Sequence, residues 1–400
     1  MPVSIPERRS KTVNQTIVTI AFVFVCLNLR IVYGGVGPLL PYMQLEPLAM
    51  SALTALPPLC MGLFAALGAT FARRFGEERA LFLSIAILTI GVLIRSFGVS
   101  GLLAGTVVAS IGIAALNVLT PVFVRQNFAA SQIGVMMGIY AMMMGLGGGL
   151  MAALAVPLYH AAGGSWPIAL GSAAIPAVVA LLALVPLLGS TNKPKTLDRP
   201  AQPWHWLLSH PSAWSITGFF GIHCLVFYIA LSLLPAIYVD KGATPAEGGI
   251  YLALSMIGIA VGGFVGPTLA ARKRDHRPHI LASVVLCIIG FLGVLLAPAA
   301  TGPLWAIILG SGMGAGLALP GVLYAKRTAD RHHMAQLSGM VQTFGYLIAA
   351  TGPLIATALH GWSGGWTWPL AFVLALLVLN GFIGLRGGRD HLIGSEGRTS

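Results

Sequence analysis

The chain has 400 residues, of which 56% are hydrophobic and only 8% are charged. An ordinary globular protein carries about 25% charged residues, so a soluble fold of this size could not cover its surface. The same composition excludes a disordered chain and a coiled coil. The formal net charge is +12, but the basic residues stand in short clusters between long apolar runs, as at the charged face of a membrane. We therefore expect an all-α integral membrane protein without a nucleic-acid partner.

Twelve apolar runs are long enough to cross a bilayer, which requires roughly 20 residues each. The first run follows the basic residues of the N-terminal tail and is too long for the core of a cleaved signal peptide. We therefore expect it to be an uncleaved span. The predicted spans are 15–43, 48–71, 80–98, 101–124, 132–159, 165–188, 213–239, 247–271, 279–298, 302–325, 335–360 and 365–385.

A Pro-rich and Lys-rich linker over 189–212 divides these spans into two sets of six. The second set repeats the first, because Gly68–Arg79 aligns with Gly266–Arg277 at a shift of 198 residues, with one Gly, one Thr, one Ala and two Arg in common. Two related six-helix halves with a site between them at the midplane are typical of transporters. The expected organisation is a tail (1–14), a bundle (15–188), the linker (189–212), a second bundle (213–385) and a second tail (386–400).

The positive charges predict the orientation in the membrane. Of the 23 Lys and Arg residues, 20 fall in the tails, the linker and the even-numbered turns. Basic residues concentrate on the cytoplasmic side, so we expect both termini in the cytoplasm and the protein in the inner (plasma) membrane. The exceptions are Arg30, Arg95 and Lys241.

The basic turn after the second span, with Gly68, Arg73, Gly76 and Arg79, resembles the signature loop of the major facilitator superfamily. The resemblance implies a cytoplasmic gate. The residues expected to form it are Arg73, Arg74, Gly76, Arg79 and Arg272. The acidic residue that this signature usually carries is replaced by Ala72, and by Ala270 in the second half, which leaves Glu77, Glu78 and Asp275 as candidates for the missing charge.

A narrower resemblance covers nearly the whole chain. Asn28-Leu-Arg30, Val36–Pro41 and Leu53–Pro57 look like the cyanate permease branch, which also includes nitroimidazole transporters. The second half agrees at Leu234-Pro235, Gln342/Gly345/Tyr346 and Gly352-Pro353. Ile31 stands where the branch often has proline. This resemblance implies secondary transport of a small solute.

Arg30 is the sharpest candidate for the binding site. It lies about halfway along the first span, where a cation costs roughly 2.5–3.5 kcal/mol and marks a functional site by default. All eleven acidic residues fall at span ends or in loops, so an incoming anion would be the natural counter-charge. The alternative is that helix-end carbonyls or cavity water satisfy Arg30.

Further polar and aromatic residues are candidates for the same cavity. His223, flanked by Phe220 and Phe227, could bind substrate or carry a proton near neutral pH, or bond a carbonyl as a buried histidine. Asn117, Gln342 and Tyr346 could line the cavity or bridge helices. The predicted substrate-binding set is Arg30, Asn117, Tyr140, His223, Phe227, Gln342 and Tyr346, and the candidates for proton coupling are His223 and Glu247.

These observations favour a secondary active transporter that moves a small anion, such as cyanate, by alternating access around Arg30. An exporter of neutral nitro-heterocycles or other small drugs is the alternative, and a membrane-embedded enzyme is a remote one. No ATP-binding motif appears, and the four cysteines lie in apolar runs without a CxxC pair. We expect no cofactor, no metal site, a lipid environment and a monomer.

Overall fold

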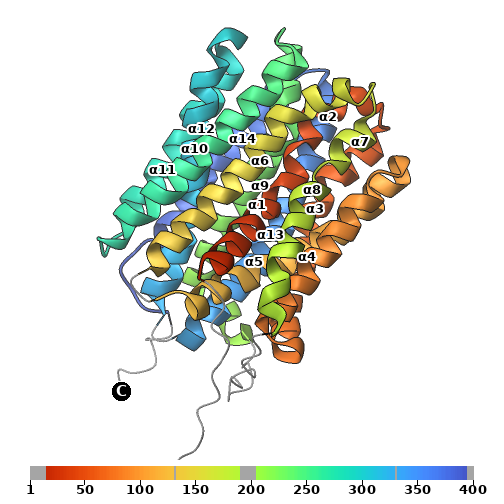
Figure 1. Cartoon of the computed structure of the whole chain (residues 1–400). Helices are drawn as coiled ribbons and strands as arrows, with labels where there is room; N and C mark the ends of the chain where they lie inside the picture. Colours follow the sequence, from red (N-terminus) through yellow and green to blue (C-terminus); the bar gives the residue numbers. More distant parts are fainter. Residues whose placement is uncertain (1–14, 130–131, 190–203, 329–330, 394–400) are drawn as a thin grey trace, which may run out of the picture.

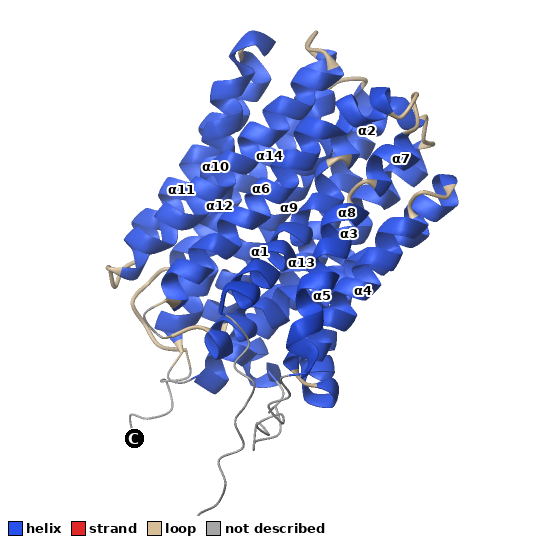
Figure 2. Cartoon of the chain, viewed as in Figure 1, coloured by secondary structure: helices blue, strands red, loops and turns tan. Residues whose placement is uncertain are grey.

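The computed structural model describes residues 15–129, 132–189, 204–328 and 331–393, and within these ranges the regular secondary structure is helical (Figure 2). Short 3-10 segments are η1 (Val185–Gly189), η2 (Trp204–Ser209) and η3 (Ala299–Thr301). The α helices are α1 (Gln15–Gly34), α2 (Val36–Met43), α3 (Pro47–Phe75), α4 (Glu77–Ile94), α5 (Gly98–Asn127), α6 (Ile133–Ala161), α7 (Trp166–Gly171), α8 (Ala174–Leu184), α9 (Pro211–Asp240), α10 (Pro245–Ala271), α11 (Arg277–Leu296), α12 (Gly302–Arg327), α13 (Arg331–Ser363) and α14 (Thr367–Gly387).

Eleven candidate spans in the described ranges are long and apolar enough to cross a membrane. The span expected over 80–98 is helical as α4, but the 18 residues of this helix begin with Glu77, Glu78 and Arg79. Two other expected spans are interrupted. The span expected over 15–43 divides into α1 and α2, because Pro38 has no N–H for the carbonyl of Gly34. Pro176 explains in the same way why the span expected over 165–188 divides into α7 and α8.

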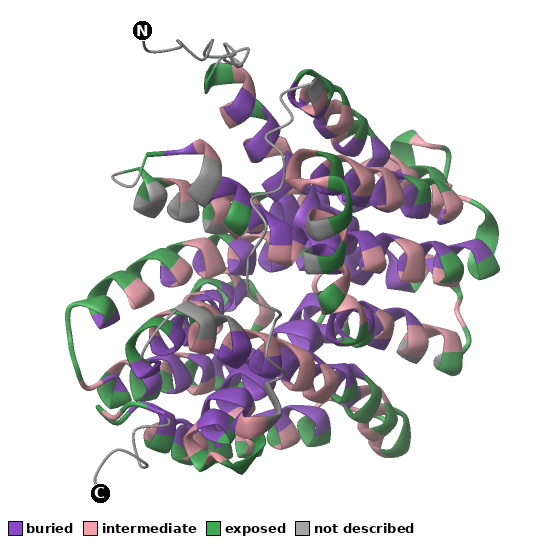
Figure 3. Ribbon diagram, turned by 90° about the horizontal axis from the view of Figure 1, so that it is seen from below, coloured by how far each residue is buried: buried purple, intermediate pink, exposed green. Residues whose placement is uncertain are grey.

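Large apolar side chains cover the outside of the helix assembly. Figure 3 shows buried residues where helices face one another and exposed residues around the periphery. Leu48, Ile175, Leu182 and Phe382 are 66–81% exposed. Water-soluble monomers rarely expose so much apolar surface, whereas lipid tails solvate it. The chain is therefore a multi-pass membrane protein.

The helices that come before residue 189 pack on those that come after it most extensively through two pairs. α3 packs on α13, and α6 packs on α10. In the predicted order of twelve spans, these are spans 2 with 11 and 5 with 8. Moving each span by six places exchanges the two pairs, which is the relation expected of two similar halves.

The aligned glycines of the sequence repeat make equivalent contacts. A Cβ atom on Gly68 of α3 would lie 2.7 Å from the carbonyl oxygen of Ala115 in α5. A Cβ atom on Gly266 of α10 would lie 2.8 Å from the Cβ of Ala315 in α12. Close approach of membrane helices requires such small residues, so the repeat reflects the same helix contact made twice.

The bundle has two distinct ends. At the termini end, α1 begins beside Asn127, which accepts a hydrogen bond from Gln15, and the N–H of Ile393 donates to the carbonyl of Arg327. At the opposite, far end lie α2 and α7 (Figure 1). There α2 packs on α9, and a Cβ atom on Gly37 would lie 2.8 Å from the carbonyl oxygen of Leu231. This contact joins the two parts of the chain at the far end.

A buried arginine organises the termini end of the second part. Arg327, at the end of α12, donates from Nη2 to the carbonyls of Arg274 (3.0 Å) and Gly388 (2.9 Å). Its Nη2 also donates to His276 Nδ1 at 2.7 Å, and its Nη1 pairs with Asp390 at 3.2 Å. One side chain therefore ties α12 to the turn before α11 and to the segment that follows α14.

A candidate substrate site around Arg30

Arg30 reaches from α1 to an aromatic surface on α9. Its Nη1 donates a hydrogen bond to the hydroxyl of Tyr228 at 3.1 Å. Its guanidinium carbon lies 4.9 Å from the ring centroid of Phe227 and 5.9 Å from that of Tyr228. Arg30 is only half-buried. The cation is therefore held by neutral groups and keeps accessible surface.

The partners of Arg30 leave its charge uncompensated. Of the described residues, Asp275 and Asp390 form ion pairs, and their partners are Arg277 and Arg327. Arg30 instead contacts a phenol oxygen and aromatic faces, which are worth about 0.5–2 kcal/mol at such sites. That an incoming anion supplies the counter-charge stays a prediction.

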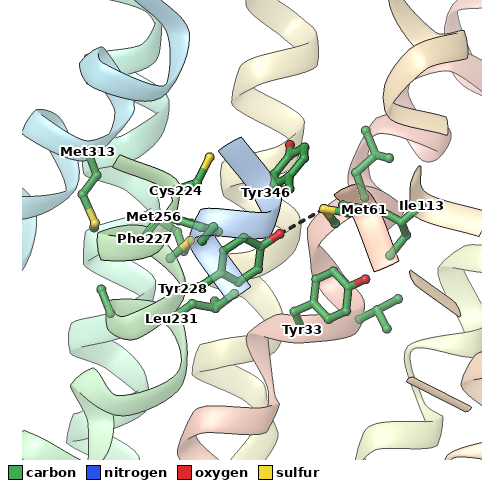
Figure 4. Packing of buried hydrophobic residues seen from close by; sticks show 14 of the residues in the cluster. Tyr33, Met61, Ile113, Cys224, Phe227, Tyr228, Leu231, Met256, Met313 and Tyr346 are labelled. Carbon is green, nitrogen blue, oxygen red and sulfur yellow. Dashed lines mark hydrogen bonds between the residues drawn. The ribbon is translucent and has the colours of Figure 1, made fainter. Parts of the chain in front are cut away.

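Tyr228 also connects Arg30 to α3. Its hydroxyl donates to the sulfur of Met61 at 3.0 Å, as Figure 4 shows. Asn117 of α5 donates from Nδ2 to the same sulfur at 3.8 Å. The structure thereby brings Asn117 into the group around Arg30. Sequence reasoning missed Tyr228 and Met61, since a Tyr beside Phe227 and a Met in an apolar run carry no distinctive pattern.

Three further tyrosines surround this group. Tyr140 on α6 and Tyr346 on α13 lie near Arg30, close enough for a charge on one group to influence the other. Tyr33 also lies near Arg30. Its hydroxyl donates a hydrogen bond to Ser110 Oγ at 2.9 Å. Figure 4 shows Tyr33, Tyr228 and Tyr346 around Met61, with the hydroxyl of Tyr228 directed at its sulfur. Tyr140 and Tyr346 were predicted, whereas Tyr33 was not.

Gln342 lies one turn before Tyr346 on α13. Its described hydrogen bond runs from Nε2 to Ser338 Oγ at 2.9 Å, within the same helix. Tyr346 packs edge-on against Phe220 of α9, with ring centroids 5.4 Å apart. The structure therefore connects Tyr346 to the aromatic face of α9, while Gln342 bonds its own helix.

The structure places His223 on another side of α9. Its ring is fully buried, with Nδ1 2.6 Å from Asn380 Nδ2 of α14. A Cβ atom on Gly316 of α12 would lie 1.9 Å from the ring. His223 and Tyr228 are five residues apart, which corresponds to about 140° around a helix. Tyr228 therefore faces Arg30, and the ring of His223 packs into the interior of the second bundle.

Glu247, the other candidate for proton coupling, caps α10. Its Oε2 accepts hydrogen bonds from the N–H (2.7 Å) and hydroxyl (2.9 Å) of Thr244, and its own N–H donates to Thr244 Oγ1 at 3.2 Å. This reciprocal arrangement is a capping box. Glu247 is exposed at the start of α10. It does not belong to the group around Arg30.

The predicted gate residues lie at the termini end of α3, α4 and α10. Gly76 joins α3 to α4 with φ of 82°, a conformation that favours glycine. Arg74 is exposed, with its guanidinium carbon 5.5 Å from the ring centroid of Phe75. Arg79 and Arg272 are exposed as well. The side chain of Arg73 lies outside the described part of the chain.

Two other polar residues have structural partners. Asn28 of α1 donates to the carbonyl of Pro176 in α8 at 2.9 Å and so bonds a neighbouring helix. Lys241 donates to the carbonyls of Val294 (2.6 Å) and Ala297 (2.6 Å), at the end of α11. A cation at a helix C-terminus is stabilising. The Lys241 side chain is also partly buried, and this desolvation lowers its pKa.

Comparisons with known proteins agree on one kind of protein. The family model described as "Major Facilitator Superfamily" matches residues 18–353. A "2-nitroimidazole transporter" of Escherichia coli (strain K12) is 32% identical over 95% of this chain and 97% of its own length. A "Cyanate transport protein" of the same organism is 28% identical over 90% and 95%. The crystal structure of a bacterial homologue of the human lysosomal transporter Spinster superimposes with a TM-score of 0.69 at 16% identity, covering 96% of this chain and 98% of its own.

Proposed function

Because the chain belongs to the major facilitator superfamily, in the branch with nitroimidazole and cyanate transporters, we propose that it is a secondary active transporter of a small anion such as cyanate. The observation that carries the proposal is Arg30, a cation inside the bundle whose described partners are a phenol and two aromatic faces. A guanidinium offers a planar fork of donors that suits carboxylate-like or linear anions.

The proposed mechanism is alternating access by two six-helix halves, residues 15–188 and 213–385. Arg30 belongs to the first half, and Phe227 and Tyr228 belong to the second. A solute bound between them would contact both halves, as expected for a transporter site at the interface of repeats. We propose cytoplasmic termini, a gate of basic residues at the termini end and a monomeric protein.

Binding to the purified protein tests the anion proposal. Cyanate, nitrate and short carboxylates are screened by thermal shift, since a ligand that binds only the folded state raises the melting temperature with its concentration. We expect stabilisation of the wild type, loss in Arg30→Gln and partial retention in Arg30→Lys, which keeps the charge but not the fork. Uptake of labelled cyanate into proteoliposomes then tests transport. Equal stabilisation of wild type and Arg30→Gln would contradict the proposal.

An exporter of nitro-heterocycles is the second candidate. The rings of Phe227 and Tyr228 beside Arg30 favour it, because a flat heterocycle could stack there while its nitro oxygens accept from the guanidinium. Phe227→Leu separates the candidates. This change should weaken binding of 2-nitroimidazole about tenfold through lost stacking and weaken cyanate binding much less. Stabilisation by 2-nitroimidazole but by no anion would favour the second candidate.

A further inference from the structure

We infer that the hydroxyl of Tyr228 is a second ligand of the transported solute, which releases its hydrogen bond to Met61 when the solute binds Arg30. The inference rests on the proposed function, because it takes Arg30 as the primary anion ligand. It assigns a binding role to a residue of the second bundle that faces Arg30 of the first.

The hydroxyl hydrogen of Tyr228 is donated to a weak acceptor. A tyrosine hydroxyl has one hydrogen to donate and lone pairs to accept with. Its oxygen accepts from Arg30 Nη1 at 3.1 Å, and its hydrogen points to Met61 Sδ at 3.0 Å. A thioether is a weak acceptor. The one donor that α9 presents at this position is therefore held by a partner that a better acceptor would displace.

An anion on Arg30 would be that better acceptor. Tyr228 already lies within hydrogen-bond distance of the guanidinium, so a solute bound to the next position of the same fork comes to lie beside the hydroxyl. Hydrogen bonds to a charged acceptor are roughly twice as strong as those between neutral groups. The O–H can rotate about its C–O bond, so the exchange of acceptors needs no displacement of the fully buried ring.

The exchange changes which helices are connected. In the structure, α9 is bonded to α1 through Arg30 and to α3 through Met61. With solute, α9 and α1 would share the anion, and the bond to α3 would be given up. Asn117 would keep its contact with Met61 from α5. Solute binding would thus exchange one contact between the two parts of the chain for another. Because the solute must accept hydrogen bonds from both Arg30 and Tyr228, the site favours solutes with a further acceptor atom next to the anionic centre.

Two matched variants test the role of Tyr228. Tyr228→Phe keeps the ring and removes the hydroxyl, and we expect cyanate affinity to fall about ten- to a hundred-fold, as for a hydrogen bond to a charged group. Met61→Leu keeps the hydroxyl and removes its competing acceptor, so cyanate should bind at least as tightly as in the wild type. Affinity in Tyr228→Phe equal to or tighter than in the wild type would overturn the inference.

A second measurement follows the exchange directly. With 13C-methyl-labelled methionine, the signal of Met61, assigned from Met61→Leu, should shift when cyanate is added to the wild type. The shift should be absent in Arg30→Gln. An unshifted Met61 signal at saturating cyanate would overturn the inference even if Tyr228→Phe failed to fold. Loss of binding in Arg30→Gln with normal binding in Tyr228→Phe would refute this inference alone, whereas normal binding in Arg30→Gln would refute the proposed function.

Discussion

Arg95, which directly follows α4, donates a hydrogen bond from Nη1 to the backbone carbonyl of Val32, two residues after Arg30. Val32 lies in the last turn of α1, just before the chain breaks and restarts as α2. Carbonyls at the end of a helix lack partners in the helix and attract cations. Arg95 thus fixes the end of the helix segment that carries Arg30. Its Nε and Nη2 are buried without a described partner.

Arg95→Met should separate stability from transport. Burying a cation costs several kcal/mol, while leaving the Val32 carbonyl without its donor costs about 1–3 kcal/mol. The melting temperature of the variant should therefore equal or exceed that of the wild type. Transport of labelled cyanate should fall, because the end of α1 loses its anchor, and Arg95→Lys should restore part of it. A large drop in melting temperature would show that Arg95 is a net stabilising residue.

Gly37→Ala should block closure of the far end. The added Cβ would lie 2.8 Å from the Leu231 carbonyl oxygen and 3.0 Å from that of Ser232. Overpacking of this kind costs about 1–3 kcal/mol, which would shift the balance of conformations by about five- to 150-fold. Transport in proteoliposomes should fall accordingly. Gly361→Ala is the matched control, since its Cβ meets no atom within 4 Å, and equal transport rates in both variants would contradict this reasoning.

His223→Gln should affect stability more than binding. The ring packs against α12 and lies 2.6 Å from Asn380, so its loss should cost about 1–3 kcal/mol of folding free energy. Cyanate affinity should stay within about twofold, as for independent sites. Thermal shift with and without cyanate measures both. A tenfold loss of affinity at an unchanged melting temperature would place His223 in the site after all, as the sequence suggested.

His276 should make stability depend on pH. Burial, and then the positive charge of Arg327, lower the pKa of His276 in the folded protein, and the neighbouring charges of His279 and Lys326 act in the same direction. The unfolded chain then binds more protons, with a pKa of about 6.5. Stability should therefore fall as the pH drops below about 6.5. Apparent melting temperatures between pH 5 and 8 should show this.

His276→Gln supplies the control for that prediction. Glutamine keeps an acceptor for Arg327 Nη2 but does not titrate, so the variant should lose less stability than the wild type at low pH. Asp275 beside it titrates lower, because hydrogen bonds from Arg277 hold its pKa at about 2. A pH profile that is identical in wild type and variant would exclude His276 as the source.

The sequence by itself determined the class, the family branch and the isolation of Arg30. These follow from quantities that are local along the chain: hydropathy, the spacing of basic turns and the position of carboxylates outside the spans. The repeat around Gly68 and Gly266 could be aligned without coordinates, because close helix contacts demand small residues at fixed positions. Breaks at Pro38 and Pro176 were not anticipated, since proline can also be accommodated inside a membrane helix.

Only the tertiary structure decided which residues meet. Sequence periodicity places residues on faces of one helix, but it does not say which neighbouring helix each face meets. The partner of each face depends on how closely two helices can approach. Gly37 lets α2 come close to α9, and Gly316 lets α12 come close to the ring of His223. These contacts turn Phe227 and Tyr228 toward Arg30 and bring Met61 within reach of the hydroxyl. His223 also lies among aromatic residues of α9, but its ring packs into the second bundle because Gly316 leaves room for it there.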